Sequence, residues 1–196
     1  MIIRRAEFYA RYTAELDELD EGQVLALEEL LDQVEQDQDL HDVQQLAYIL
    51  ATVRHETGDT WRPVREVGRG KGHWYGEPCR LDAETSEAYY GRGYVQLTGL
   101  RNYARMSILL GVSLVERPDI LITNAAISYR VLSWGMTGGL FTGRRLDEFI
   151  PVTGEHADYV NARRVVNGLD RASLIAGYAE RLELVLRASA SLEAVG

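Results

Sequence analysis

The segment "VQQLAYILATVRHET", residues 43–57, constrains the fold more than any other stretch of the chain. Its apolar side chains run nearly all round a helix, and such a helix is stable only when other elements cover most of its sides. Asp42 precedes it as a candidate N-cap, and Gly58 follows it as a natural C-cap residue. The segment therefore predicts a central, largely buried helix with several partners packed around it.

Six further stretches have helical spacing of apolar residues. They are residues 4–19, 22–36, 101–111, 124–137, 156–166 and 171–190. Residues 58–88 are rich in glycine and aromatic residues and have little periodicity, which predicts a long functional loop with one short helix. The following "YYGRGYVQLTG", residues 89–99, predicts a short β-hairpin. The expected fold is mainly α (α+β), with about eight helices and a small hairpin.

Length and charge narrow the function classes. We expect residues 1–196 to form one domain, in which residues 1–40 are an acidic helical part. The net charge of −9 disfavours binding to nucleic acid, and no run of about 18 apolar residues exists to insert into a membrane. The N-terminus turns charged before a signal-peptide core can form, so we expect a monomer that stays cytoplasmic until another protein releases it.

The residues that most often hold metals are sparse. Cys79 is the only cysteine, so neither an intrachain disulfide nor a cysteine-based zinc cluster is expected. His55 lies beside a glutamate, but "HETGD" lacks the second histidine of the H-E-x-x-H zinc motif. We expect neither a metal nor an organic cofactor.

Two glutamates in "RHETGDTWRPVRE" are candidates for acid–base chemistry. Glu56 ends the central helix and Glu66 follows Pro63, which an unbroken helix cannot pass, so the chain is free to turn back. Partial burial at the helix end favours a protonated acid, and a wetter loop favours an ionised base, as glycoside hydrolysis requires. The alternative is two surface glutamates, with Glu66 paired to Arg62 or Arg65.

Three blocks of sequence carry a family resemblance. They are "HETG", "YYGRGYVQLTGLRNY" and "ARRVVNGLD". In this order and spacing they resemble the chitinase-like family 19 glycoside hydrolases, especially the bacterial and phage cell-wall lysozyme (endolysin) branch, over about residues 45–185. The resemblance implies a lysozyme-like fold with a substrate cleft between two lobes and inverting hydrolysis of β-1,4 bonds next to N-acetylated amino sugars. It implies peptidoglycan as the partner, with chitin as the alternative.

The resemblance also implies roles for single residues. Glu56 is the general acid, and Glu66 is the base that activates water, although Glu77 and Glu84 lie in the same loop. Thr98 would hold the nucleophilic water, unless it is an ordinary strand residue. The residues implied to bind the sugar chain are Tyr90, Gln96, Asn102 and Asn167. For Asn167, which precedes a glycine, a simple turn is the alternative.

Aromatic and arginine side chains complete the expected site. Trp61 and Trp74 have flat apolar faces that suit stacking on a sugar ring, whereas Tyr89 is expected in the core. Arg92 is expected to form an ion pair with a catalytic carboxylate. The family's arginine in the final helix, which pairs with the catalytic glutamates, aligns with a leucine here, so Arg171 is its expected replacement and Arg181 the other candidate.

Two other functions remain open at this stage. A non-catalytic glycan-binding or structural phage protein would keep the aromatic cleft without needing both acids. A toxin-type effector would share the chemistry and differ in delivery. The retained "HET" and "YYGRG" motifs favour the enzyme over the binding protein.

Overall fold

The computed structural model describes residues 1–81, 86–152 and 156–191. Within these residues the chain forms eight α-helices, three short 3-10 helices and three two-stranded antiparallel sheets. This confirms the predicted mainly helical fold. The chain divides into two compact units, the first comprising Met1–Trp61 with Ser133–Gly196 and the second Arg62–Leu132. The predicted cleft between two lobes stays a prediction.

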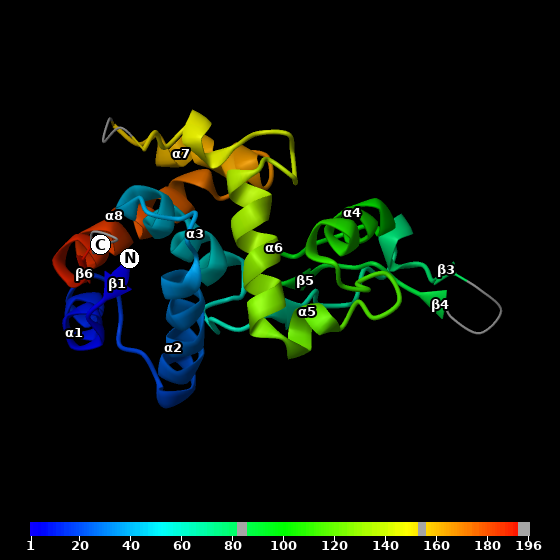
Figure 1. Cartoon of the computed structure of the whole chain (residues 1–196), viewed down its shortest axis with the longest axis horizontal. Helices are drawn as coiled ribbons and strands as arrows, with labels where there is room; N and C mark the ends of the chain where they lie inside the picture. The colour runs from blue at the N-terminus through cyan, green and yellow to red at the C-terminus, as the bar shows by residue number, and fades with distance from the viewer. Residues whose placement is uncertain (82–85, 153–155, 192–196) are drawn as a thin grey trace. The chain divides into compact units, whose positions relative to one another are not determined.

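The first unit is built around α3 (Val43–Glu56), the predicted central helix. Every residue from Gln45 to Arg54 is buried, which confirms the prediction that this helix needs cover on most sides. The helix α8 (Ala172–Ser189) packs along both α3 and α1 (Arg5–Glu15), as Figure 1 shows. Two short strands, β1 (Ile2–Ile3) and β6 (Ala190–Ser191), pair beside them.

Local signals set the helix ends in this unit. The Asp42 side chain accepts a hydrogen bond from the Gln45 amide at 2.8 Å, so the predicted N-cap is confirmed. Gly58 follows the end of α3 with φ +59°, a left-handed conformation that glycine adopts at little cost. A capping box of Asp20 and Gln23 begins α2 (Glu21–Gln36).

Several predicted boundaries shift. The helix expected over 4–19 ends at Glu15, after which Asp17 bonds to Arg54 of α3. The helix expected over 156–166 is α7 (Tyr159–Ala162), which continues as the 3-10 helix η3 (Arg163–Val165). A second 3-10 helix, η2 (Leu146–Glu148), follows α6 (Ala125–Thr137).

The second unit holds the expected loop and hairpin. Its elements are β2 (Val64–Arg65), η1 (Trp74–Gly76), β3 (Cys79–Arg80), β4 (Ser86–Glu87), β5 (Arg92–Gly93), α4 (Leu100–Leu110) and α5 (Ile120–Thr123). The strand β5 pairs with β2, and a bridge between Arg92 and Leu97 closes the turn expected in "YYGRGYVQLTG". The hairpin prediction therefore holds for the turn but missed β2 as the main partner. The four-residue α5 was also missed, because no helix was predicted between residues 111 and 124.

Among the described residues, no helix has the length and apolar character needed to cross a membrane.

Candidate active site

Glu56 lies at the last position of α3 and is held by an arginine. Its Oε1 accepts a hydrogen bond from Nη1 of Arg163 at 2.7 Å. The Arg163 side chain is only 3% exposed and that of Glu56 17%, so water screens this ion pair little. The Nε of Arg163 donates to the carbonyl of Asp170, which fixes the guanidinium at the end of α7. The carboxylate of Glu56 is therefore largely shielded from solvent and is held through one of its two oxygens.

The end of α3 is locked by side chain to backbone bonds. The Thr57 hydroxyl donates to the carbonyl of Val53 at 2.8 Å and accepts from the amide of Trp61 at 3.2 Å. Both bonds tie the chain after the helix back to its last turn. Glu56 therefore projects from a rigid element. A group that must reach a substrate bond in a fixed geometry requires such support.

The predicted arginine partner of Glu56 is wrong. Arg171 is exposed and supplies the N-cap position of α8, where its backbone has φ +56°. Arg181, the other candidate, lies over the ring of Tyr178 and donates to a carbonyl of its own helix. Arg163 was not predicted although it lies in "ARRVVNGLD", because the family's arginine partner lies in the final helix. A basic residue inside a motif block was the signal available.

Trp61 does not fit the role predicted for it. Its side chain is fully buried and meets the ring of Tyr12 edge to face, at 6.1 Å between centroids. An indole with no exposed face cannot stack on a sugar, so the prediction is wrong. Asn167 is exposed, and its Oδ1 accepts a hydrogen bond from the Gly168 amide at 2.8 Å. This bond fits the turn alternative, and a sugar contact for Asn167 stays a prediction.

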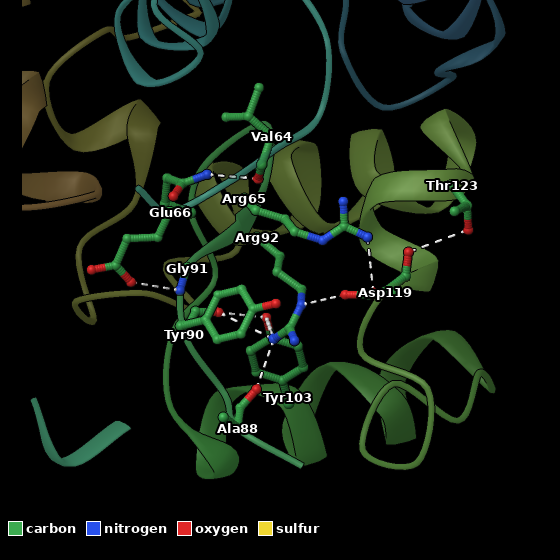
Figure 2. Close-up of polar contacts among 11 residues, drawn as sticks. Val64, Arg65, Glu66, Ala88, Tyr90, Gly91, Arg92, Tyr103, Asp119 and Thr123 are labelled. Atoms are coloured by element: carbon green, nitrogen blue, oxygen red, sulfur yellow. Dashed lines mark hydrogen bonds and ion pairs between the residues drawn. The ribbon is translucent and has the colours of Figure 1, made fainter. Parts of the chain in front are cut away.

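In the second unit, Glu66 follows β2 directly and is half-buried. Its Oε2 accepts a hydrogen bond from the Gly91 amide at 3.0 Å, and its Oε1 accepts one from the Tyr75 hydroxyl at 3.2 Å. Figure 2 shows the carboxylate reaching Gly91 and turned away from the neighbouring arginines. The structure thus holds Glu66 with neutral donors, unlike Glu56.

One alternative paired Glu66 with Arg65, but Arg65 binds Asp119 instead. Its Nη2 bonds to Asp119 at 2.8 Å, and Nε of Arg92 bonds to the other oxygen of Asp119 at 2.7 Å (Figure 2). These guanidinium groups, that of Arg65 above all, hold the pKa of Asp119 below its usual range. The prediction that Arg92 pairs with a catalytic carboxylate is therefore wrong, because Asp119 takes that place.

The other contacts of Arg92 explain why it is buried. Its guanidinium lies 3.6 Å from the centroid of the Tyr90 ring and donates to the carbonyl of Ala88 and the hydroxyl of Tyr103 (Figure 2). Burial raises the pKa of Tyr103, so its hydroxyl stays protonated. Tyr90 is itself only 6% exposed, and Arg92 covers one face of its ring. The prediction that this ring lines a cleft is therefore wrong. Tyr89 is buried, as predicted.

The remaining predicted residues form a short chain of hydrogen bonds after β5. Gln96 donates through Nε2 to the carbonyls of Val64 and Gly93, which ties β2 to β5. Thr98 donates to the carbonyl of Gln96 at 2.8 Å, and Asn102 donates to the carbonyl of Thr98 at 2.8 Å. All three side chains are half-buried, and their predicted contacts with water and sugar stay predictions.

The alternative bases fare differently. Glu77 is exposed at the end of η1, and Glu84 lies outside the described residues. Trp74, the second predicted stacking residue, is 76% exposed and lies edge to face with Tyr75 at 5.7 Å. The sequence therefore placed Glu66 and Trp74 in the same loop, but Tyr75, which bonds to Glu66, was not among the predicted site residues.

A pocket of about 630 Å³ in the first unit lies away from Glu56. Gln44 lines it, twelve residues before Glu56 on α3, or roughly 18 Å along the helix axis. Two of its three acidic residues have structural partners, because Glu183 accepts a hydrogen bond from Tyr159 at 2.8 Å and Asp158 caps α7. The volume of this pocket alone is no reason to place the chemistry there.

Comparison with solved structures gives the class of protein that this fold belongs to. Chitinase C from Streptomyces griseus HUT6037 superposes with a TM-score of 0.62 at 19% identity, covering 95% of this chain and 79% of that one. A bacterial family 19 chitinase superposes with the same TM-score over 91% of this chain. At these identities the likeness shows a shared fold, that of the family 19 chitinases.

The family follows from the sequence itself. The family model for glycoside hydrolase 19, described as chitinase class I, matches residues 39–139. A basic endochitinase from Vitis vinifera is 32% identical over 101 residues, and chitinase 8 from Oryza sativa is 43% identical over 54 residues. This chain belongs to glycoside hydrolase family 19. These matches span 46% and 28% of this chain, and only 32% and 21% of those two proteins.

Proposed function

We propose that this protein hydrolyses the β-1,4 bonds of peptidoglycan glycan strands by an inverting mechanism, as a phage-type endolysin or related cell-wall lysin. The observation that carries the proposal is the pair of fixed glutamates. Glu56 is held by Arg163 at 2.7 Å, and Glu66 is held by Tyr75 and Gly91 at 3.2 and 3.0 Å. Two immobilised carboxylates in unlike surroundings match the division of work in an inverting glycosidase.

Glu56 acts as the general acid. It donates its proton to the glycosidic oxygen as the bond to the anomeric carbon breaks, and is left as a carboxylate. Arg163, 2.7 Å away and 3% exposed, stabilises that carboxylate in a weakly screened environment. The charge therefore develops where a fixed cation already lies, and this favours departure of the proton. The same cation disfavours the protonated starting form, so Glu56 must take up its proton before the step.

Glu66 acts as the general base. It removes a proton from the water that attacks the opposite face of the sugar ring, and the product therefore has inverted anomeric configuration. This mechanism needs the two carboxylates roughly 6.5–9.5 Å apart, with room for that water. Thr98, whose hydroxyl hydrogen is donated to the Gln96 carbonyl, offers its oxygen lone pairs to the attacking water. No metal or organic cofactor takes part.

Recognition of the glycan rests on short-range contacts. The exposed indole of Trp74 offers a flat apolar face for a sugar ring, and Asn102 offers its amide oxygen to an N-acetyl or hydroxyl group. With a net charge of −9, the chain is repelled at long range by an anionic wall, so binding must come from such contacts. We expect the protein to reach the wall after another protein releases it from the cytoplasm.

Chitin is the second candidate substrate. The curated relatives are named chitinases and endochitinases, which favours polymers of N-acetylglucosamine. Peptidoglycan is favoured by the motif resemblance to the cell-wall lysozyme branch. Both polymers present the β-1,4 bond next to an N-acetylated sugar, so the same two glutamates serve either one.

The test compares wild type, Glu56→Gln and Glu66→Gln on two substrates. Turbidity loss of outer-membrane-permeabilised bacterial cells reports wall cleavage, and chitin hexamer hydrolysis reports chitinase activity. Lysis that disappears in Glu56→Gln, with cut glycan strands in mass spectra, supports the proposal. Chitin cleavage without lysis moves the substrate to chitin. If the wild type does neither and still binds wall or chitin, the protein is a glycan-binding module and the enzyme proposal is wrong.

A further inference from the structure

We propose that Tyr75 is a positioning residue for Glu66. We also propose that Tyr75 is fixed in that place by the crossing of the chain at Gly70 and Gly76, where the two backbones touch. This inference rests on the proposed role of Glu66 as the general base. Neither the tyrosine nor the two glycines belongs to the motif blocks that carry the family resemblance.

The two oxygens of Glu66 are held by two separate donors. Gly91 donates to Oε2 from a backbone that is itself bonded to Glu66, because the Glu66 amide donates to the Gly91 carbonyl at 2.8 Å. Tyr75 donates to Oε1 from a different segment, at 3.2 Å. With both donors present the carboxylate plane is fixed. With Gly91 alone it is free to rotate about its last side-chain bond, because torsions of this kind are soft.

Aromatic neighbours hold the ring of Tyr75. The imidazole of His73 stacks on it at 5.0 Å with an interplanar angle of 3°. Trp74 meets it edge to face at 5.7 Å. Tyr75 is thus packed against the two preceding side chains of its own segment, and this packing sets the direction of its hydroxyl.

The segment from Gly70 to Gly76 closes on itself through backbone contact. A Cβ on Gly76 would lie 2.0 Å from the carbonyl oxygen of Gly70, and one on Gly70 would lie 2.7 Å from Cα of Gly76. No side chain fits at either crossing point. The amide of His73 also bonds to the Gly70 carbonyl at 2.9 Å. The crossing therefore sets where η1, and with it Tyr75, lies against Glu66.

A neutral donor suits a general base better than a cation does. A guanidinium at this distance would favour the ionised carboxylate so strongly that it would take up a proton poorly. Arg65, the adjacent residue, is bound to Asp119 instead. Partial burial and the charge of Glu66 raise the pKa of Tyr75, so the hydroxyl remains a protonated donor at neutral pH. Tyr75 thus orients Glu66 and leaves it basic.

The experiment measures kcat and KM against pH for Tyr75→Phe, which removes one hydroxyl and keeps the ring. The matched control is Tyr89→Phe, which removes a hydroxyl bonded to the Val115 carbonyl at 3.0 Å. The substrate is whichever of chitin hexamer and soluble glycan strands the wild type cleaves. We expect kcat to fall roughly 10-fold in Tyr75→Phe with KM unchanged within about twofold, as for loss of a bond to a charged group.

The pH profile separates orientation from simple structural damage. Loss of a donor to the carboxylate favours its protonated form, so the acidic limb of the Tyr75→Phe profile should move to higher pH. Gly76→Ala should lower kcat in the same way by displacing η1. Its control is Gly177→Ala, whose added Cβ meets nothing within 4 Å.

Two results would overturn the inference, and they are distinguishable. If Tyr75→Phe matches Tyr89→Phe in kcat and in pH profile while Glu66→Gln is inactive, Glu66 is the base but Tyr75 does not position it. If Glu66→Gln keeps wild-type activity, the proposed base is wrong and the role of Tyr75 falls with it.

Discussion

The two glutamates of the proposed mechanism have the same side chain and opposite partners. Glu56 ends a buried helix of the first unit and is held by a cation, Arg163, with 3% of its side chain exposed. Glu66 follows a two-residue strand of the second unit and is held by two neutral donors. A cation stabilises the carboxylate left after a proton is given away, whereas neutral donors orient a carboxylate that must accept one. The assignment of Glu56 as acid and Glu66 as base comes from the family resemblance, and the difference between their partners is what the variants below test.

The largest effects are expected from substitution of the two glutamates themselves. Glu56→Gln and Glu66→Gln should each lower kcat about 10²- to 10⁴-fold, because each removes a proton-transfer group. Glu77→Gln should keep the wild-type rate, since that side chain is exposed at the end of η1. Initial rates on the cleaved substrate measure all three variants. A loss of activity in Glu77→Gln with none in Glu66→Gln would transfer the role of base to Glu77.

Removing the cation tests the first half of the comparison. Arg163→Met should lower the free energy of unfolding by about 2–3 kcal/mol, because it leaves the largely buried carboxylate of Glu56 without its partner. Arg171→Met, at the exposed position first expected to pair with Glu56, should change it by less than about 0.5 kcal/mol. Urea denaturation measures both. Equal effects would mean that the pair at 2.7 Å contributes nothing to stability.

Asp119, which binds both Arg65 and Arg92, provides a test in the second unit. Asp119→Asn should lower the free energy of unfolding by about 1–2 kcal/mol. This range is discounted for solvent screening because the Asp119 side chain is 52% exposed. The folded pKa of Asp119 is depressed, chiefly by Arg65, so its contribution is complete above the ordinary aspartate pKa and is lost as pH falls through the folded value. Acid titration of stability should therefore be shallower in Asp119→Asn. Identical acid profiles would contradict a stabilising role for this pair.

The smallest expected effect concerns long-range charge. Because the chain carries −9, raising the ionic strength should screen its repulsion from an anionic wall and speed lysis about two- to threefold. Hydrolysis of an uncharged chitin oligomer should not change. Rates from about 20 to 200 mM salt make the comparison, and lysis that slows with salt would point to attraction instead.

The sequence predicted features that depend on local chemistry. The apolar circumference of residues 43–57, the cap at Asp42 and the break at Gly58 placed α3 and therefore Glu56 correctly. Pro63, which an unbroken helix cannot pass, allowed the chain to turn and form β2, and Glu66 follows that strand directly. These signals lie within a few residues of the feature that they set.

Partners distant in sequence were predicted poorly. Arg163 reaches Glu56 across 107 residues, and Arg92 reaches Asp119 across 27. Nothing in the spacing of charges distinguishes these pairs from others in an acidic chain. Trp61 failed for a related reason, because an exposed aromatic and a buried one read alike until Tyr12 is known to cover it. Tyr75 was missed because its segment has no periodicity.

The anomeric form of the first product tests the central claim most directly. Proton NMR, recorded within minutes of adding enzyme to chitin hexamer or to soluble glycan strands, distinguishes a new α reducing end from a β one before mutarotation mixes them. A general acid at Glu56 and a base at Glu66 acting through water predict the α-anomer from a β-linked substrate. A β-anomer would mean retention through another mechanism, and would contradict the assignment of these two glutamates.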